Sequence, residues 1–225
     1  RLSIINNLFN ELAKIKHDIY FAHIKIDDLN ILNEKLQCEF SDVFINTNDI
    51  HISSIQIQKD NSYCDASLST VDNKLLLLLN KLHLEKDDLN SSISLGYDID
   101  FSSDIVICRD SLLLLNSELN YGSNSMKFNT KETSTKYVTN IYDTRLNLYH
   151  FLSLDSNRLS YLDNVLIDGD ITSIKNDSSI VNGLIKSDLG VIDFNINMKS
   201  LFDENITALL DFKNFKIGKG LNLAE

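Results

Sequence analysis

Apolar and polar residues alternate along most of this chain. In residues 91–101, SSISLGYDIDF, every second position is apolar, and the positions between them carry serine, glycine or aspartate. A period of two predicts a β-strand with one apolar and one polar face. Comparable segments recur between residues 20 and 212, and polar clusters such as DNSY and KNDSS separate them. We therefore expect a series of strands of roughly 6 to 9 residues joined by short links.

The first residues follow a different period. Five apolar residues stand three or four positions apart, as in an amphipathic helix: Leu2, Ile5, Leu8, Leu12 and Ile15. This spacing predicts a short N-terminal helix over residues 2–16. We expect residues 1–17 to lead into a sheet formed by residues 18–225. Residues 143–164 also suit a short helix or an excursion from the sheet.

No helical pattern separates consecutive strands, so the sequence lacks the crossovers that parallel strands need. The chain is therefore predicted to be mainly β, with its strands following one another as an antiparallel meander. Each strand has one apolar side, and the apolar face of such a sheet must meet a second sheet, a helix or lipid. A sandwich, a barrel and a long curled groove all satisfy this requirement.

Composition narrows the choice of partners. The chain is 43% hydrophobic, enough to bury a core, and it has no proline and only 7 glycines, so Asn, Asp, Ser and Lys must form most turns. The net charge of −11, without a basic cluster, argues against a nucleic-acid partner. The longest apolar run, Leu75 to Leu79, is far shorter than the ~20 residues of a transmembrane helix. Because the chain begins with Arg1, we expect a fragment or a processed form.

The sequence contains no recognisable catalytic or metal-binding motif. It lacks the G-x-S-x-G of serine hydrolases and the G-K-[ST] ending of a phosphate-binding loop. The five histidines are scattered, without the paired spacing of a metal site. Cys38, Cys64 and Cys108 are widely spaced and are predicted to be small buried hydrophobes, although one disulfide remains an alternative. We expect no enzymatic activity, no cofactor and no metal.

The C-terminal third carries a more informative pattern. Residues 162–221 follow the order strand, glycine-marked turn, SDLGVIDFNINMK, turn, and a strand ending ALLDFKNFKIGKGL. This order resembles the AsmA/TamB superfamily of envelope proteins, especially the TamB-like translocation and assembly proteins of Bacteroidetes. The residues at matching places are Leu189, Gly190, Phe194, Phe212, Phe215, Ile217 and Gly218. Residues 137–161 resemble the segment that leads into this unit, so the resemblance covers residues 137–221.

The resemblance implies a curled antiparallel β-sheet, sometimes called a β-taco, whose apolar groove bridges the inner and outer membranes. It implies a periplasmic location in the cell envelope, with anchoring segments outside this chain. The implied work is to carry phospholipid by its acyl chains, or to assist outer-membrane assembly with a BamA-like barrel protein. An acyl chain on an apolar surface is stabilised by up to about 0.8 kcal/mol per buried CH₂. Evenly repeated apolar stripes suit a conduit because no deep pocket traps the cargo.

The candidate groove lining is the apolar side of the clearest strands. It consists of Ile93, Leu95, Tyr97, Ile99, Phe101, Leu113, Leu115, Ile192, Phe194, Ile196, Met198, Leu210 and Phe212. In an alternative interpretation, the same residues fill the closed core of a β-sandwich that serves as a binding or adhesion module of a surface or envelope complex. An enzyme or a scaffold subunit within a larger envelope complex is a third interpretation. Phospholipid bound to detergent-free protein would favour the groove over the sandwich.

Overall fold

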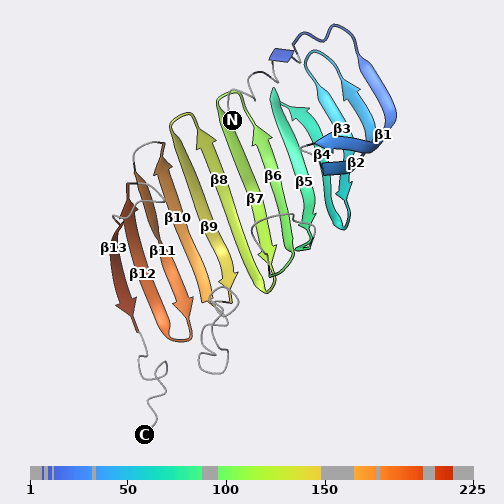
Figure 1. Ribbon diagram of the computed structural model, residues 1–225. Coiled ribbons are helices and arrows are strands. Elements are labelled where there is room, and N and C mark those ends of the chain that lie inside the picture. The colour runs from blue at the N-terminus through green and yellow to red at the C-terminus, as the bar shows by residue number, and fades with distance from the viewer. Residues whose placement is uncertain are drawn as a thin grey trace. The chain divides into compact units, whose positions relative to one another are not determined.

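The computed structural model describes residues 7, 10–11, 13–31, 34–87, 96–147, 165–175, 178–199 and 206–214. These residues form a mainly β protein with thirteen strands in one open antiparallel sheet (Figure 1). Each strand pairs with its neighbours in the sequence, and β1 and β13 are the two edges. The predicted antiparallel meander is therefore confirmed. The described strands form no second sheet.

The chain divides into two compact units, Arg1–Gly122 (unit 1) and Ser123–Glu225 (unit 2). Unit 1 contains β1 (Ile19–Ile31), β2 (Glu34–Ile45), β3 (Ile50–Lys59), β4 (Ser62–Val71), β5 (Lys74–Leu84), β6 (Ile99–Ile107) and β7 (Ser111–Tyr121). Unit 2 contains β8 (Asn124–Thr133), β9 (Lys136–Leu146), β10 (Val165–Ile174), β11 (Ser179–Ser187), β12 (Gly190–Met198) and β13 (Ile206–Lys213).

Several sequence predictions concern residues that the structure does not describe. Most of the helix predicted over residues 2–16 lies outside the described residues, as do residues 91–95 and 148–164. The predicted strand over residues 91–101 is corrected at its described end, because β6 begins only at Ile99 and Tyr97 lies in a bend before it. Glycine at position 96 weakens the strand there, despite the alternating pattern.

Four strands of unit 1, with 10 to 13 residues each, are longer than predicted because β-bulges interrupt the alternation within them. At one point in each of β1, β3, β5 and β7, the strand contains one more residue than the strand it pairs with, so the register shifts by one. The bulge in β7 places Asn116 at φ 50°, a conformation that asparagine tolerates better than most residues. Each bulge sets two residues opposite one and bends its strand. Because the alternation is interrupted at the bulge, the sequence pattern predicts two shorter strands in place of one long strand.

The register sorts the side chains of unit 1 onto two faces, because residues directly opposite in an antiparallel pair share a face. One row crosses all seven strands of the unit through residues that are all apolar. It consists of Phe21, Val43, Ile52, Leu68, Leu77, Ile105 and Leu114. A second row on the same face consists of Ile26, Cys38, Ile57, Cys64, Leu82, Phe101 and Leu119. We call this side the apolar face of unit 1.

Unit 2 has its own apolar face, on which two neighbouring glycines allow a close approach. Gly169 of β10 lies opposite Gly183 of β11, which lies opposite Phe194 of β12. A Cβ atom added to Gly183 would lie 2.4 Å from the carbonyl oxygen of Asp168 and 2.7 Å from Cζ of Phe194. The Phe194 ring therefore covers the glycine, as aromatic rings do over strand glycines elsewhere.

We expect Gly183→Ala to lower the free energy of unfolding by roughly 1–3 kcal/mol, because the backbone must shift to admit the methyl group. Urea denaturation followed by circular dichroism measures this change. Gly96→Ala is the matched control, since its added Cβ meets only the Tyr121 hydroxyl at 3.4 Å. Equal stability of the two variants would contradict the close packing of β10 on β11.

Candidate apolar binding face

The apolar face of unit 1 is continuous from strand to strand. Its third row consists of Ile24, Phe40, Ile55, Ala66, Leu79, Ser103 and Ser117. The two serines at its end are buried and hydrogen-bond to one another at 2.8 Å, so their hydroxyls satisfy each other. No charged side chain stands in any of the three rows. The face is therefore suited to hydrocarbon and not to a polar ligand.

Few side chains on this face are fully buried. Among the described residues, the buried apolar ones are Cys38, Val43, Ile50, Ala66, Leu75 and Val165. Most other members of the three rows are intermediate in exposure, and Phe21 is 49% exposed. A two-layer protein of this size normally covers such a face with a second packed layer. Here the described strands leave it without one.

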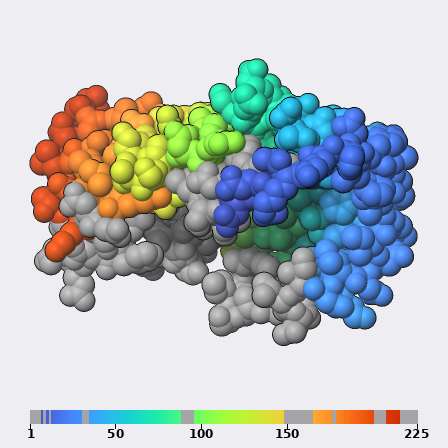
Figure 2. Space-filling view, turned by 90° about the horizontal axis from the view of Figure 1, so that it is seen from above, coloured from blue at the N-terminus to red at the C-terminus, as the bar shows by residue number. Residues whose placement is uncertain are grey.

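Unit 1 has a hollow at each end of this face. Figure 2 shows the protein from above in a space-filling view, with unit 1 in blue to green. The apolar hollow, of about 190 Å³, is lined by Leu36, Ile57, Lys59, Ser62, Tyr63, Cys64, Leu82 and Leu84. The polar hollow, of about 430 Å³, is lined by Ala13, Thr47, Asn48, Thr70, Asn73, Leu75 and Arg109. The apolar hollow lies beside the β3–β4 turn, whereas the polar hollow lies among the β2–β3, β4–β5 and β6–β7 turns.

The predicted lining residues of unit 2 all share one face. Ile192, Phe194, Ile196 and Met198 alternate along β12, and Leu210 and Phe212 lie opposite Phe194 and Ile192 on β13. This face continues into β11 through Val181 and Ile185 and into β10 through Ile171 and Ile167. Leu210 and Phe212 are 49% and 54% exposed at the edge strand.

The predicted lining residues of unit 1 are divided between the two faces. Ile99 and Phe101 lie on the apolar face, opposite Tyr121 and Leu119. Tyr97 packs edge-on against Tyr121, with ring centroids 5.5 Å apart. Ile93 and Leu95 lie outside the described residues.

Leu113 and Leu115 lie on the opposite face of unit 1, because they pair with Val106 and Asp104. Their neighbours Leu112 and Leu114 occupy the apolar face instead, opposite Ile107 and Ile105. Sequence reasoning missed these two residues because Leu112–Leu115 is a run of four leucines without any alternation. Leu119, later in this strand, lies on the apolar face, but its position does not show which leucines of the run share that face. The bulge at Asn116 adds one residue between the run and Leu119 and so reverses which positions, odd or even, face the apolar side.

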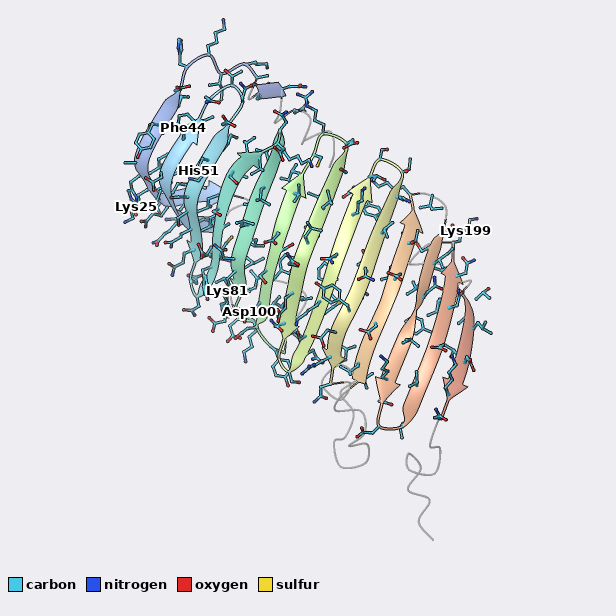
Figure 3. The ribbon with its side chains drawn as sticks, turned by 180° about the vertical axis from the view of Figure 1, so that it is seen from behind. Lys25, Phe44, His51, Lys81, Asp100 and Lys199 are labelled. Carbon is cyan, nitrogen blue, oxygen red and sulfur yellow. The ribbon has the colours of Figure 1, made fainter. Side chains whose placement is uncertain are left out.

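The other face of unit 1 carries a cluster of cross-strand polar contacts. Lys81 of β5 and Asp100 of β6 form an ion pair at 3.4 Å (Figure 3). His83 Nδ1 lies 2.7 Å from the same carboxylate, and its ring stacks on Tyr63 of β4 with centroids 5.2 Å apart. The hydrogen bond from His83 lowers the pKa of Asp100, and Lys81 lowers it further. This cluster joins three strands on the solvated side of the sheet.

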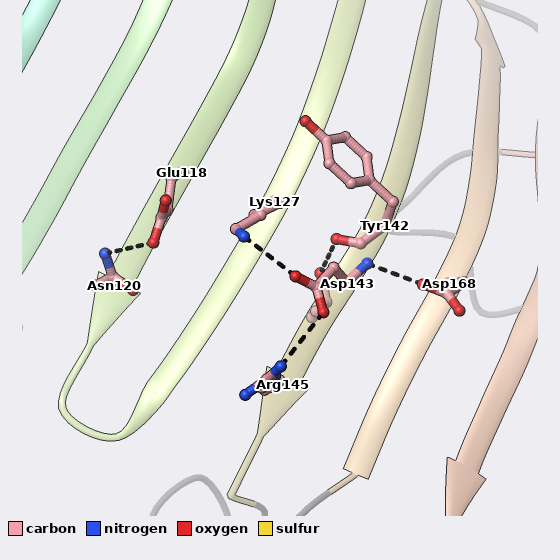
Figure 4. A network of polar contacts seen from close by, with 8 residues as sticks. Glu118, Asn120, Lys127, Tyr142, Asp143, Arg145 and Asp168 are labelled. Atoms are coloured by element: carbon pink, nitrogen blue, oxygen red, sulfur yellow. Dashed lines mark hydrogen bonds and ion pairs between the residues drawn. The ribbon is translucent and has the colours of Figure 1, made fainter.

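Unit 2 has a comparable polar network around the β9 bulge. Asp143 has a φ of 45°. Its carboxylate accepts a hydrogen bond from the Lys127 ammonium at 3.1 Å and lies 3.8 Å from the Arg145 guanidinium (Figure 4). Its backbone N–H donates to Asp168 of β10 at 2.9 Å. The hydrogen bond from Lys127 lowers the pKa of Asp143. These contacts hold the bulge in place from both neighbouring strands.

An ion pair between Lys175 and the buried Glu132 lies at one end of the apolar face of unit 2. Glu132 is only 5% exposed, and the Lys175 ammonium donates to it at 2.9 Å. The same ammonium lies 4.6 Å from the centroid of the Tyr137 ring, a cation–π contact. The Lys175 backbone N–H donates to Thr135, so the β10–β11 link is fastened to the β8–β9 turn.

The remaining features of the described residues concern metal binding, thiols and membrane helices. No three His, Cys, Asp or Glu side chains among them are placed to hold a metal ion. Cys38, Cys64 and Cys108 are free thiols, and burial raises the pKa of Cys64. Within the described part of the chain, no helix is long and apolar enough to cross a membrane.

No protein-family model, curated protein or solved structure matches this chain. The resemblance to TamB-like proteins is therefore still a prediction, and the function has to be argued from the geometry of the sheet.

We expect Asp100→Asn to lower the free energy of unfolding at pH 7 by less than about 1 kcal/mol, because the carboxylate is 39% exposed and solvent screens the pair. The folded-state pKa is lowered, so this stabilisation is complete above the unfolded-state pKa of about 3.9 and is lost as the pH falls through the folded-state value. Urea denaturation between neutral and acidic pH measures it. Asp188→Asn, in the exposed β11–β12 turn, is the control, and a difference that persists at low pH would refute the assignment.

Proposed function

We propose that this chain is a segment of a TamB/AsmA-like bridge in the cell envelope, which carries phospholipid along an apolar surface, assists outer-membrane assembly, or does both. The observation that supports the proposal most directly is the set of apolar rows that cross all seven strands of unit 1 on one face of an open sheet. These rows are incompletely buried and, apart from the two serines at the end of the third row, consist of apolar residues. The proposal places the chain in the periplasm and assigns it no catalytic role.

The energetics of such a face suit a mobile lipid. Each methylene that leaves water contributes about 0.8 kcal/mol, and the repeated rows offer similar contacts at each strand. A lipid can then move from row to row with small changes in free energy. The opposite face of each unit carries ion pairs and hydrogen-bonded clusters that water can solvate.

In this proposal the partners are phospholipid acyl chains, the two membranes and a BamA-like barrel protein. The alternative, a β-sandwich binding or adhesion module, requires two sheets packed face to face at about 10 Å. The described strands form one sheet, and no contact among them favours the sandwich.

Neighbouring leucines on β5 provide a matched test. Leu77 lies on the apolar face between Leu68 and Ile105, whereas Leu76 lies on the other face between Ser69 and Val106. Both are intermediate in exposure. We expect phospholipid to co-purify with the detergent-free wild-type protein and Leu77→Asp to reduce its amount at least about fivefold, because the carboxylate is unpaired among apolar groups. Leu76→Asp should retain the lipid.

Mass spectrometry of organic extracts measures the lipid-to-protein ratio. Urea denaturation establishes whether the two variants remain folded to a similar extent. Absence of phospholipid from every wild-type preparation, or equal loss in two equally folded variants, would count against the proposal.

A further inference from the structure

The two hollows of unit 1 lie on the same strands, at opposite ends of the apolar face. On β4, Cys64 lines the apolar hollow and Thr70 the polar one, and on β5 the corresponding residues are Leu82 and Leu75. At about 3.3 Å per residue, the six positions from Cys64 to Thr70 separate the hollows by roughly 20 Å. Between them the face continues through Ala66 and Leu68 on β4 and through Leu77 and Leu79 on β5.

The polar hollow contains groups that can bind a phosphate. The Arg109 guanidinium is a planar donor that matches phosphate oxygens. Thr70 Oγ1 accepts from the Ile50 N–H at 2.9 Å, which leaves its own proton for a further acceptor. Leu75, at 1% exposed, forms the apolar floor where the hollow joins the face.

The turns that form this hollow also carry carboxylates, on residues next in sequence to its lining residues. In each of the three turns that form it, an aspartate stands next to a lining residue: Asp49 beside Asn48, Asp72 beside Asn73, and Asp110 beside Arg109. One guanidinium among several carboxylates does not favour a purely anionic ligand. The charges suit a head group that carries both a phosphate and an ammonium.

The separation of the hollows matches the length of a phospholipid. A bilayer is about 40–45 Å thick including its head groups, so one lipid spans roughly 20 Å. The volume of the apolar hollow, about 190 Å³, exceeds that of an apolar cavity of about 150 Å³ that accepts benzene. It therefore has room for the last few carbons of an acyl chain.

We propose that a zwitterionic phospholipid lies parallel to β4 and β5 on the apolar face of unit 1. Its phosphate contacts Arg109, its ammonium faces the turn carboxylates, and its acyl chains extend toward Cys64 and Leu82. This inference rests on the proposed function and adds a resting position and an orientation for the cargo. A lipid lying across the strands could not reach both hollows at once.

Photocrosslinking of the intact chain tests the orientation. The probes are two phosphatidylethanolamines, one with a diazirine at the acyl terminus and one with a diazirine on the head group, supplied in phosphatidylcholine vesicles. Peptide mass spectrometry should place the acyl crosslinks at residues 57–64 and 82–84. The head-group crosslinks should fall at residues 47–48, 70–73 and 109.

A substitution tests the phosphate contact. We expect Arg109→Gln to weaken binding of the head-group probe about tenfold, in the range of a charged hydrogen bond. Arg145→Gln is the control, because Arg145 lies on β9 of unit 2 and its side chain is 68% exposed. A phosphatidylglycerol probe, which has no ammonium, should bind more weakly than phosphatidylethanolamine.

The outcomes separate this inference from the proposed function. Acyl crosslinks spread over the middle of β1–β7, or Arg109→Gln binding as tightly as wild type, would overturn the orientation while leaving phospholipid transport intact. If phosphatidylglycerol bound more tightly than phosphatidylethanolamine, the assignment of a zwitterionic head group would be wrong. Failure of both phosphatidylethanolamine probes to bind or crosslink would remove the proposed function as well.

Discussion

The rest of the structure depends on the register of antiparallel pairing, which keeps the apolar rows of each unit on one face. A slip of one residue would move the whole apolar set of a strand to the polar side. The β4–β5 turn shows how the register is fixed, because Asp72 and Asn73 both have positive φ, at 50° and 59°. This is the conformation of the two-residue turns that match the twist of a hairpin. Aspartate and asparagine thus take the place that glycine holds in many other proteins.

The bulges modify this register without destroying it. In β5, both Asn80 and Lys81 stand between Leu79 and Leu82, opposite the single residue Ser102, so the leucines on either side remain on the apolar face. The extra residues of β3, β5 and β7 are polar: Ser53, Asn80 and Asn116 hydrogen-bond to Asp42, Asp65 and Asp104 on neighbouring strands. Each bulged strand is thereby longer on its polar side, which bends it toward the apolar face.

The two faces divide the work of stability and binding. On the polar side, Lys81, His83 and Asp100 join neighbouring strands through contacts that water weakens, while each backbone ladder supplies the cooperative connection. The net charge of −11 favours solubility of a chain that exposes so much apolar surface. On the apolar side, similar side chains recur in every strand. The affinity of such a surface for an alkyl chain depends on the apolar area that is buried, so it discriminates little between alkyl chains. Selectivity for a head group requires the polar turns at the end of the surface.

The sequence by itself determined that the chain is mainly β, antiparallel and apolar on one face of its strands, because a period of two is a local property that side chains impose. In β12 the alternation was unbroken, and Ile192, Phe194, Ile196 and Met198 share a face as predicted. Only the tertiary structure decided the faces of the leucine runs, since Leu112–Leu115 is a run of four leucines without alternation. Their assignment depends on one extra residue, Asn116, which has a left-handed conformation and stands at the register shift between β6 and β7. The polar hollow likewise joins residues from separate turns, and the apolar hollow joins residues from four strands, β2 to β5, which no local pattern brings together.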